Sequence, residues 1–168
     1  MKRAPRHKLV TKSQVEMTEM VLPNDTNRLG NLLGGRLMQW IDIAAAIAAF
    51  RHTNRVCVTA SLDALNFHHP IKQSEVVVLR ASVNRVFHSS LEIGVRVVKE
   101  DPLTGERKHT NTAYLTFVSL DEKGRPVACL PVKPISREEK RRFREAGERR
   151  EQRLLHRPRS KEGRRAVA

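Results

Sequence analysis

The stretch from Pro23 to Arg51 constrains the fold more than any other part of this chain. It opens with turn-forming residues, since Pro, Asn, Asp and Gly each favour a bend for a backbone reason of their own. It then becomes apolar: five alanines and three isoleucines lie between Ile41 and Phe50, with Asp42 as the one charged residue among them. A helix that is apolar on every side is normally buried, because it would otherwise expose a large apolar patch. We therefore predict a buried helix over about residues 34–50 that carries one acid.

The start of this helix is formed by the pair Gly34 and Gly35. A helix N-terminus has unpaired backbone N–H groups and a partial positive charge. Glycines at that point let a carbonyl oxygen approach the N–H groups, so the pair is a candidate oxyanion hole. The alternative is that the two glycines only begin a tightly packed helix.

The net charge of +14 is concentrated at the two ends of the chain. Residues 1–14 contribute +5, residues 133–168 contribute +8, and the part between them is nearly neutral at +1. We predict a basic N-terminal arm over residues 1–13, one globular domain over 14–132 and a basic tail over 133–168. In the tail, Ser136 and Glu139 have the spacing of a capping box, which predicts a solvated charged helix from Ser136 to about Leu155 and disorder beyond it.

The two cysteines, Cys57 and Cys129, have no CxxC spacing, which argues against a zinc site and against a disulfide framework. We expect each to be a small buried thiol in a reducing compartment. The basic N-terminus lacks the apolar core of a secretory signal. The longest apolar run is far shorter than the ~20 residues that cross a bilayer. We therefore expect a cytoplasmic protein without a membrane span.

Alternating and β-branched segments predict five strands around the helix. One precedes the helix and four follow it, in the order of a meander with a hairpin turn at residues 101–106; the predicted ranges are 14–22, 56–67, 75–87, 91–99 and 110–120. One apolar helix cannot cover two faces of a sheet, so the sheet should wrap around it. Such complete burial of the helix also suggests a partner subunit.

Three passages resemble the hotdog-fold acyl-CoA thioesterases, specifically the branch of cytosolic acyl-CoA hydrolases. They are PNDTNRLGNLLGGRLMQWID, RHTNRVCVTASLDALNFHHPI and HSSLEIGVRVVKEDPLTGERKHTNTAYLTFVSLDEKGRPV. The match runs over roughly residues 18–132. The resemblance implies an α+β hotdog fold, with an antiparallel sheet wrapped around one long apolar helix, and hydrolysis of fatty acyl-CoA to free CoA and a carboxylic acid.

The resemblance also implies a site pair, which by motif position falls on Asn31 and Asp42. The two residues are 11 positions apart, which is ~16 Å along a helix axis. They should therefore meet across chains, Asn31 of one subunit opposite Asp42 of the other, so that a two-fold homodimer forms two equivalent sites. Assembly of such dimers into a trimer of dimers follows from the resemblance alone.

The mechanism that we expect uses the Gly35 N–H, supported by Gly34, to bind the thioester oxygen. Asp42 acts either as a general base on water or as a nucleophile that gives a mixed anhydride, and these alternatives stay open. Asn31 orients the water or the carbonyl. Thr59, on a strand expected to face the partner helix, could hydrogen-bond the acid or the water.

Binding of coenzyme A, as part of the substrate and product, requires contacts to its phosphates and its pantetheine arm. The resemblance implies His88, Ser89 and Ser90 for that arm, and basic residues are candidates for the phosphates: Arg55, Arg80 and Arg85. No cofactor is expected. The pair His68–His69 invites a metal site, but two histidines at a strand end before Pro70 are more typical of a turn.

Two other functions compete with the hydrolase. The first is a hotdog module that senses acyl-CoA and uses its basic tails on nucleic acid; neither end shows a helix-turn-helix pattern or interleaved aromatics, so no nucleic acid is expected. The second is a hotdog dehydratase, which needs a histidine near the acid, and the predicted helix contains none. Trp40 and Phe50 could shorten the acyl pocket, but the acyl-chain length cannot be read from the sequence.

Overall fold

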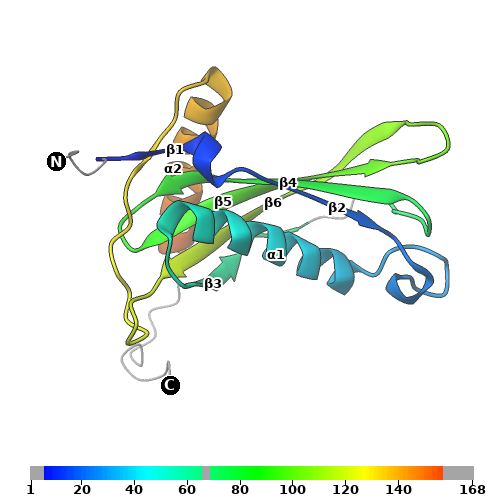
Figure 1. The fold of residues 1–168 in the computed structure, drawn as a ribbon, viewed down its shortest axis with the longest axis horizontal. Helices are drawn as coiled ribbons and strands as arrows, with labels where there is room; N and C mark the ends of the chain where they lie inside the picture. Colours follow the sequence, from blue (N-terminus) through cyan, green and yellow to red (C-terminus); the bar gives the residue numbers. More distant parts are fainter. Residues whose placement is uncertain (1–5, 66–68, 157–168) are drawn as a thin grey trace.

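The computed structural model describes residues 6–65 and 69–156. Predictions that fall on His68, on the first five residues or on the tail beyond residue 156 lie outside this part of the chain. The elements follow one another as shown in Figure 1: β1 (Lys8–Leu9), a 3-10 turn (Val10–Ser13), β2 (Val15–Met20), a second 3-10 turn (Pro23–Asp25), α1 (Gly34–Thr53), β3 (Cys57–Leu62), β4 (Val76–Val86), β5 (Ser90–Glu100), β6 (Arg107–Ser119), β7 (Val132–Lys133) and α2 (Arg137–Leu155).

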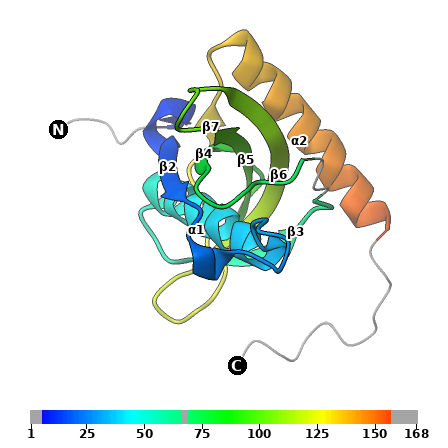
Figure 2. The same cartoon turned by 90° about the vertical axis from the view of Figure 1, so that its right-hand side faces the viewer.

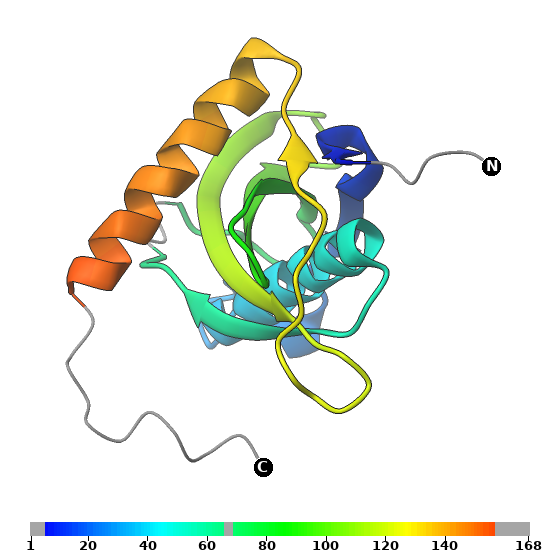
Figure 3. The same ribbon diagram turned by 90° about the vertical axis from the view of Figure 1, so that its left-hand side faces the viewer.

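The main sheet has five antiparallel strands in the order β2-β4-β5-β6-β3. It curls around α1, as the resemblance implied (Figure 3). The predicted four-strand meander is wrong in one respect, because β3 pairs with β6 and not with β4. In the sequence, β3 ends at Leu62 and β4 begins only at Val76. β3 therefore forms one edge of the sheet.

Helix α1 lies along the concave side of the sheet and is three residues longer than predicted. It ends at Thr53, and Asn54 takes the left-handed conformation that terminates it, with φ 54°. Its core-facing side is fully buried at Ile41, Ala44, Ala45, Ala48 and Ala49. The opposite side is not buried within one chain, since Met38, Ile43 and Phe50 are each more than 40% exposed. Within one chain α1 is therefore not buried on every side as predicted, and a second protein surface would be needed to cover its exposed side.

The inner face of β5 shows why the strand alternation was informative. Leu91, Ile93, Val95 and Val97 are all completely buried against α1. Glu92 points to the outer face of the sheet and is also completely buried. A buried carboxylate is costly unless other groups pair with it and donate hydrogen bonds to it. Helix α2 provides such groups for Glu92.

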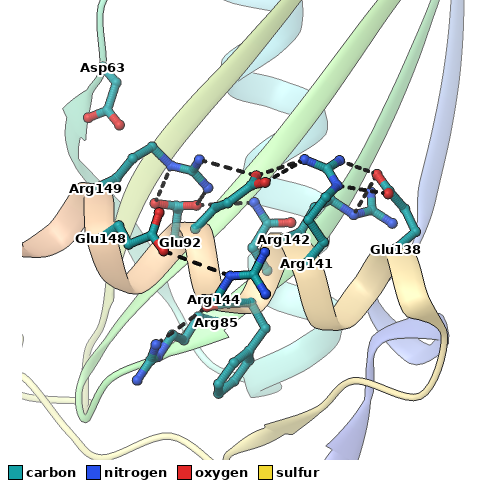
Figure 4. Close-up of polar contacts among 12 residues, drawn as sticks. Asp63, Arg85, Glu92, Glu138, Arg141, Arg142, Arg144, Glu148 and Arg149 are labelled. Carbon is teal, nitrogen blue, oxygen red and sulfur yellow. Dashed lines mark hydrogen bonds and ion pairs between the residues drawn. The ribbon is translucent and has the colours of Figure 1, made fainter.

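Helix α2 starts at the predicted capping box, in which Ser136 Oγ accepts a hydrogen bond from the Glu139 N–H at 3.1 Å. It is not solvated on all sides as predicted; it packs on the outer face of the sheet (Figure 2). The Arg149 guanidinium donates to both oxygens of Glu92, at 2.7 and 3.2 Å, and Arg153 donates to both oxygens of Asp63, at 2.7 and 3.0 Å. Figure 4 shows Arg149 reaching down to Glu92 from the helix.

Both cysteines are free, with Cys57 buried and Cys129 half-buried. Burial raises the pKa of both thiols above the ordinary value. A raised pKa favours the protonated thiol, which is the less nucleophilic form. Among the described helices, none combines the length and the hydropathy needed to cross a membrane.

Candidate functional site

A hydrogen bond between α1 and β3 joins the two polar groups that the sequence singled out. Thr59 Oγ1 donates to Asp42 Oδ1 at 2.7 Å. The Asp42 side chain is half-buried, in the third turn of a helix whose neighbouring positions face the core. The sequence had suggested that the strand of Thr59 faces the helix of a partner subunit. In the structure Thr59 instead bonds Asp42 of its own chain. The ladder between β3 and β6 is irregular directly after Thr59.

The first turn of α1 provides donors for an anion. The N–H groups of Arg36 and Leu37 both donate to the Leu33 carbonyl. Those of Gly34 and Gly35 have no such bond to a described residue and are available to a substrate oxygen. A Cβ placed on Gly35 would meet no atom within 4 Å. The space on the side-chain side of Gly35 is therefore open, so no described residue crowds this glycine there.

An apolar cleft of about 340 Å³ adjoins this helix start, lined by Leu32, Gly34, Leu37, His69, Pro70 and Ile71. Asp42 lies eight residues further along α1 than Gly34, which is ~12 Å at the rise of a helix. The cleft and the helix start thus lie well away from the Asp42 carboxylate of the same chain. One chain holds two parts of a site that are separated along its own helix.

The loop before α1 is held by Asn27. Its Oδ1 accepts hydrogen bonds from the N–H groups of Leu29 and Asn31, at 2.9 and 3.2 Å, and its own N–H donates to the Asn31 carbonyl. Asn31 is half-buried, and its side chain makes no hydrogen bond to a described residue. No hydrogen bond joins Asn31 to Asp42 within these parts of the chain. The predicted pair is therefore not assembled by one subunit.

The predicted CoA-binding residues divide into three places. His88, Ser89 and Ser90 lie in the turn from β4 to β5, and the Arg85 guanidinium lies over the neighbouring Phe87 ring at 5.5 Å. Arg80 is elsewhere on β4, paired with Glu16 at 2.7 Å, and five residues from Arg85, which is ~17 Å along a strand.

Arg55 lies beyond the C-terminal end of α1. It lines a cleft of about 690 Å³ together with Phe50. The structure therefore brings Arg85 together with the His88–Ser90 turn and leaves Arg80 apart from it. Arg55 lies towards the same end of the sheet as the turn, because β3 begins two residues after it beside Ser119, whose N–H donates to the Ser89 carbonyl at 2.9 Å.

Two groups near the site were missed by sequence reasoning. Arg150 of α2 donates to Ser90 Oγ at 3.1 Å, and the only signal in the sequence was the capping box that predicted its helix. His52 was placed outside the predicted helix but lies within α1, so the premise that the helix has no histidine is wrong. Its Nε2 bonds the Leu130 carbonyl at 2.8 Å. His52 also lies ten residues from Asp42, or ~15 Å along the helix, and so does not reach that acid within one chain.

Known proteins are similar to this chain in sequence and in fold. A family model described as "Thioesterase superfamily" matches residues 29–106. An uncharacterized acyl-CoA thioester hydrolase of Bacillus subtilis is 44% identical over 135 residues, which are 80% of this chain and 78% of that protein. Mouse acyl-coenzyme A thioesterase 11 is 41% identical over 144 residues; they are 86% of this chain but only 24% of the mouse protein.

Solved structures of acyl-CoA thioesterases have folds similar to that of this chain. A hexameric acyl-CoA thioesterase in its apo form has a TM-score of 0.85 at 37% identity, covering 88% of this chain and 96% of that one. An acyl-CoA hydrolase of Staphylococcus aureus, in complex with butyryl coenzyme A, coenzyme A and coenzyme A disulfide, has a TM-score of 0.84 at 34% identity, covering 89% and 91%. Structures of that hydrolase also exist with single alanine replacements of an aspartate, a threonine and an asparagine.

Proposed function

This chain belongs to the thioesterase superfamily, and we propose that it hydrolyses the thioester bond of fatty acyl-CoA to give free CoA and a carboxylic acid. The observation that carries the proposal is the half-buried Asp42 carboxylate, held by Thr59 at 2.7 Å. Relatives whose names state acyl-CoA hydrolysis match four-fifths or more of the chain, which supports the same substrate class.

Asp42 can act on a water because Thr59 occupies only one of its oxygens. In the proposed step the second oxygen takes a proton from water, whose oxygen bonds to the thioester carbon. The carbonyl oxygen becomes an oxyanion that accepts the Gly35 N–H at a helix start. When this intermediate collapses, the carbon–sulfur bond breaks and the proton passes from Asp42 to the CoA thiolate. Direct attack by Asp42, giving a mixed anhydride that water then cleaves, uses the same groups.

We place the Gly35 N–H and Asp42 of one site on different subunits. Within one chain they are separated along α1, and the exposed side of that helix adjoins the free edge of the sheet at β3. Val56 and Val58, on and beside this strand, are 64% and 44% exposed. An unpaired strand edge with apolar side chains is a surface that a second copy covers readily. The hexameric relative supports assembly beyond this homodimer, as a trimer of dimers.

The spacing in the Staphylococcus aureus hydrolase bears on which asparagine takes part. There the substituted threonine follows the aspartate by 17 positions, as Thr59 follows Asp42 here. The substituted asparagine precedes the aspartate by 15 positions, which corresponds to Asn27 and not to Asn31. In this chain the Asn27 side chain is exposed. Its amide oxygen, Oδ1, accepts hydrogen bonds from two backbone N–H groups, so the side-chain NH₂ points away from them and can donate to a substrate. We therefore rank Asn27 ahead of the predicted Asn31.

Thiol release from a panel of acyl-CoAs, from acetyl to palmitoyl, tests the activity and reads the chain length that the site accepts. Asp42→Ala should lower kcat by about 10² to 10⁴, the usual contribution of a positioned acid or base. The oligomer should persist on size exclusion. Asn27→Ala should cost far more activity than the neighbouring control Asn31→Ala. Full activity of Asp42→Ala would reject the proposed role.

A mixing experiment tests whether subunits share the site. If Asp42 and Asn27 of one site come from different chains, a hybrid of Asp42→Ala with Asn27→Ala has one intact site and one doubly altered site. After subunit exchange, half of the dimers are hybrids, so the mixture should regain about a quarter of wild-type activity. If both residues of a site came from one chain, every site would carry a lesion and the mixture would stay inactive.

A further inference from the structure

Two guanidinium groups from different elements share one aromatic ring at the turn from β4 to β5. Arg85 of β4 lies over the Phe87 ring at 5.5 Å, and Arg150 of α2 lies over the same ring at 4.3 Å. The guanidinium carbons therefore cannot lie further apart than the sum of these two distances. Two like charges near one ring repel each other, and an anion that contacts both would offset this repulsion.

No carboxylate of the described residues pairs with either group. The other arginines that α2 directs at the sheet do have such partners: Arg149 is 2.7 Å from Glu92 and Arg153 is 2.7 Å from Asp63. Arg85 and Arg150 make only neutral contacts, Arg85 with the Phe143 carbonyl and Arg150 with Ser90 Oγ. The two positive charges are therefore left without compensation in this part of the chain, at a turn whose next residue, His88, is exposed.

Both groups are held in place without an anion. The Arg85 guanidinium is 4.5 Å from the Phe143 ring and lies against the backbone of α2. A Cβ on Gly147 would come within 2.3 Å of Arg85 Nη1, so a larger residue there would displace the guanidinium from its present position. In Figure 4 Arg85 lies beneath the helix. Arg150 is fixed by its ring contact and by Ser90. A guanidinium has five N–H donors, and most of those of Arg85 and Arg150 have no acceptor among the described residues.

We propose that Arg85 and Arg150, with Ser90, form a site for the phosphate group of a phosphate ester. Such a group is anionic and offers several acceptor oxygens, which suits two planar, permanently charged donors. The ligand is either a phosphate of CoA or that of a separate nucleotide, because the chemistry at the site is the same for both. The link to CoA rests on the proposed function, whereas binding of a phosphate does not. On this proposal the C-terminal helix contributes to ligand binding and is not only a cover for the sheet.

Titration calorimetry with the full-length protein tests the site, using CoA, 3′-dephospho-CoA and ADP as ligands. Arg150→Gln should weaken the binding of a ligand that uses the site about tenfold or more, because a charge-assisted hydrogen bond contributes on that order. Arg144→Gln is the matched control: it makes the same change on the same helix, but its side chain is 71% exposed and directed to solvent. Thermal unfolding of both variants checks that α2 stays docked. Arg85→Gln should repeat the loss.

The outcomes separate the ligands from one another. A loss for CoA that is absent for 3′-dephospho-CoA supports the site and assigns it to the 3′-phosphate. A loss for ADP with CoA unchanged supports the site and assigns it to a separate nucleotide. If Arg150→Gln and Arg144→Gln bind all three ligands alike, the proposal is overturned. Should the wild-type protein release no thiol from any acyl-CoA, the proposed function fails, while the calorimetry still decides whether phosphate binds here.

Discussion

Replacement of Arg149 by methionine should be strongly destabilising, because it removes the main partner of a completely buried carboxylate. Glu92 has no exposed side-chain surface, and its oxygens accept two hydrogen bonds from Arg149 and one from Asn84, at 3.1 Å. Methionine retains most of the apolar stem of arginine, so the change chiefly removes the charge and its donors.

The magnitude follows from the contacts that remain. Loss of one partner of a buried ion pair costs about 3 to 5 kcal/mol, because the other charge stays buried without compensation. Here Arg153 still lies 3.5 Å from Glu92. We therefore expect the lower end, about 3 kcal/mol, which is ~6 to 12 °C in Tm for a domain of this size. Replacing the pair together, with Glu92→Gln in the same chain, should recover much of this loss.

Urea unfolding followed by circular dichroism gives the free energy of unfolding, and all variants must be compared at one protein concentration because assembly also stabilises the fold. Arg144→Met serves as the control, since Arg144 meets only Glu148 on the exposed side of the same helix. A loss below about 1 kcal/mol for Arg149→Met would show that Glu92 is not held as a buried charge. It would contradict the account of how α2 docks.

Three further predictions concern the catalytic pair, the pH dependence and the packing under α2. Thr59→Val should lower kcat about tenfold to a hundredfold with little change in KM, because a hydrogen bond to a charged group is lost, and Thr59→Ser should restore it. Burial, with the nearby charge of Lys8, lowers the pKa of His52 below its ordinary value. The contribution of neutral His52 to the free energy of unfolding should therefore be complete above about pH 6.5 and be lost as the pH falls below that value. The variant His52→Gln should flatten this pH dependence in unfolding experiments. Gly94→Ala puts a Cβ 2.7 Å from Asn84 Nδ2 and should cost about 1 to 3 kcal/mol, most of which should vanish in an Asn84→Ala background.

The parts of the fold that local patterns control were predictable from the sequence. Alternation along residues 91–97 identified the inner face of β5, and the spacing of Ser136 and Glu139 identified the start of α2. The position of β3 was not predictable, because it pairs with β6, which begins more than 40 residues after β3 ends, and not with the next strand in the sequence. Strand order is set by such long-range pairing, and period-2 patterns carry no information about it.

The docking of α2 was missed for a different physical reason. A hydrophobic pattern indicates a buried helix face, but this helix meets the sheet largely through Arg149 and Arg153. Their partners, Glu92 and Asp63, are 57 and 90 residues away in the sequence. Nothing local distinguishes an arginine that faces solvent from one that pairs with a buried acid, so the helix was predicted as solvated.

At the candidate site, residue chemistry was more informative than position. Asp42 stood out as the one acid on an apolar helix, and Thr59 as a hydroxyl on a strand expected to face the partner's helix. The structure joins the two within one chain. Asn27 was interpreted only as a turn former, and it does form a turn, through the N–H groups of Leu29 and Asn31. A side chain that closes a loop and also faces a substrate cannot be recognised from turn propensity alone.

The charge of +14 made nucleic acid an alternative partner, which the sequence did not favour, and the distribution of charge on α2 bears on that alternative. Five of the seven arginines of α2 lie within 4 Å of a carboxylate: Arg141, Arg142, Arg144, Arg149 and Arg153. Binding along a nucleic-acid backbone requires a row of cations whose charge is free to replace counterions. Arg85 and Arg150 have no carboxylate partner among the described residues, and they come from different elements but lie against one ring. Two such groups suit a single phosphate, which is why the helix is better explained by a small anionic ligand than by a polyanion.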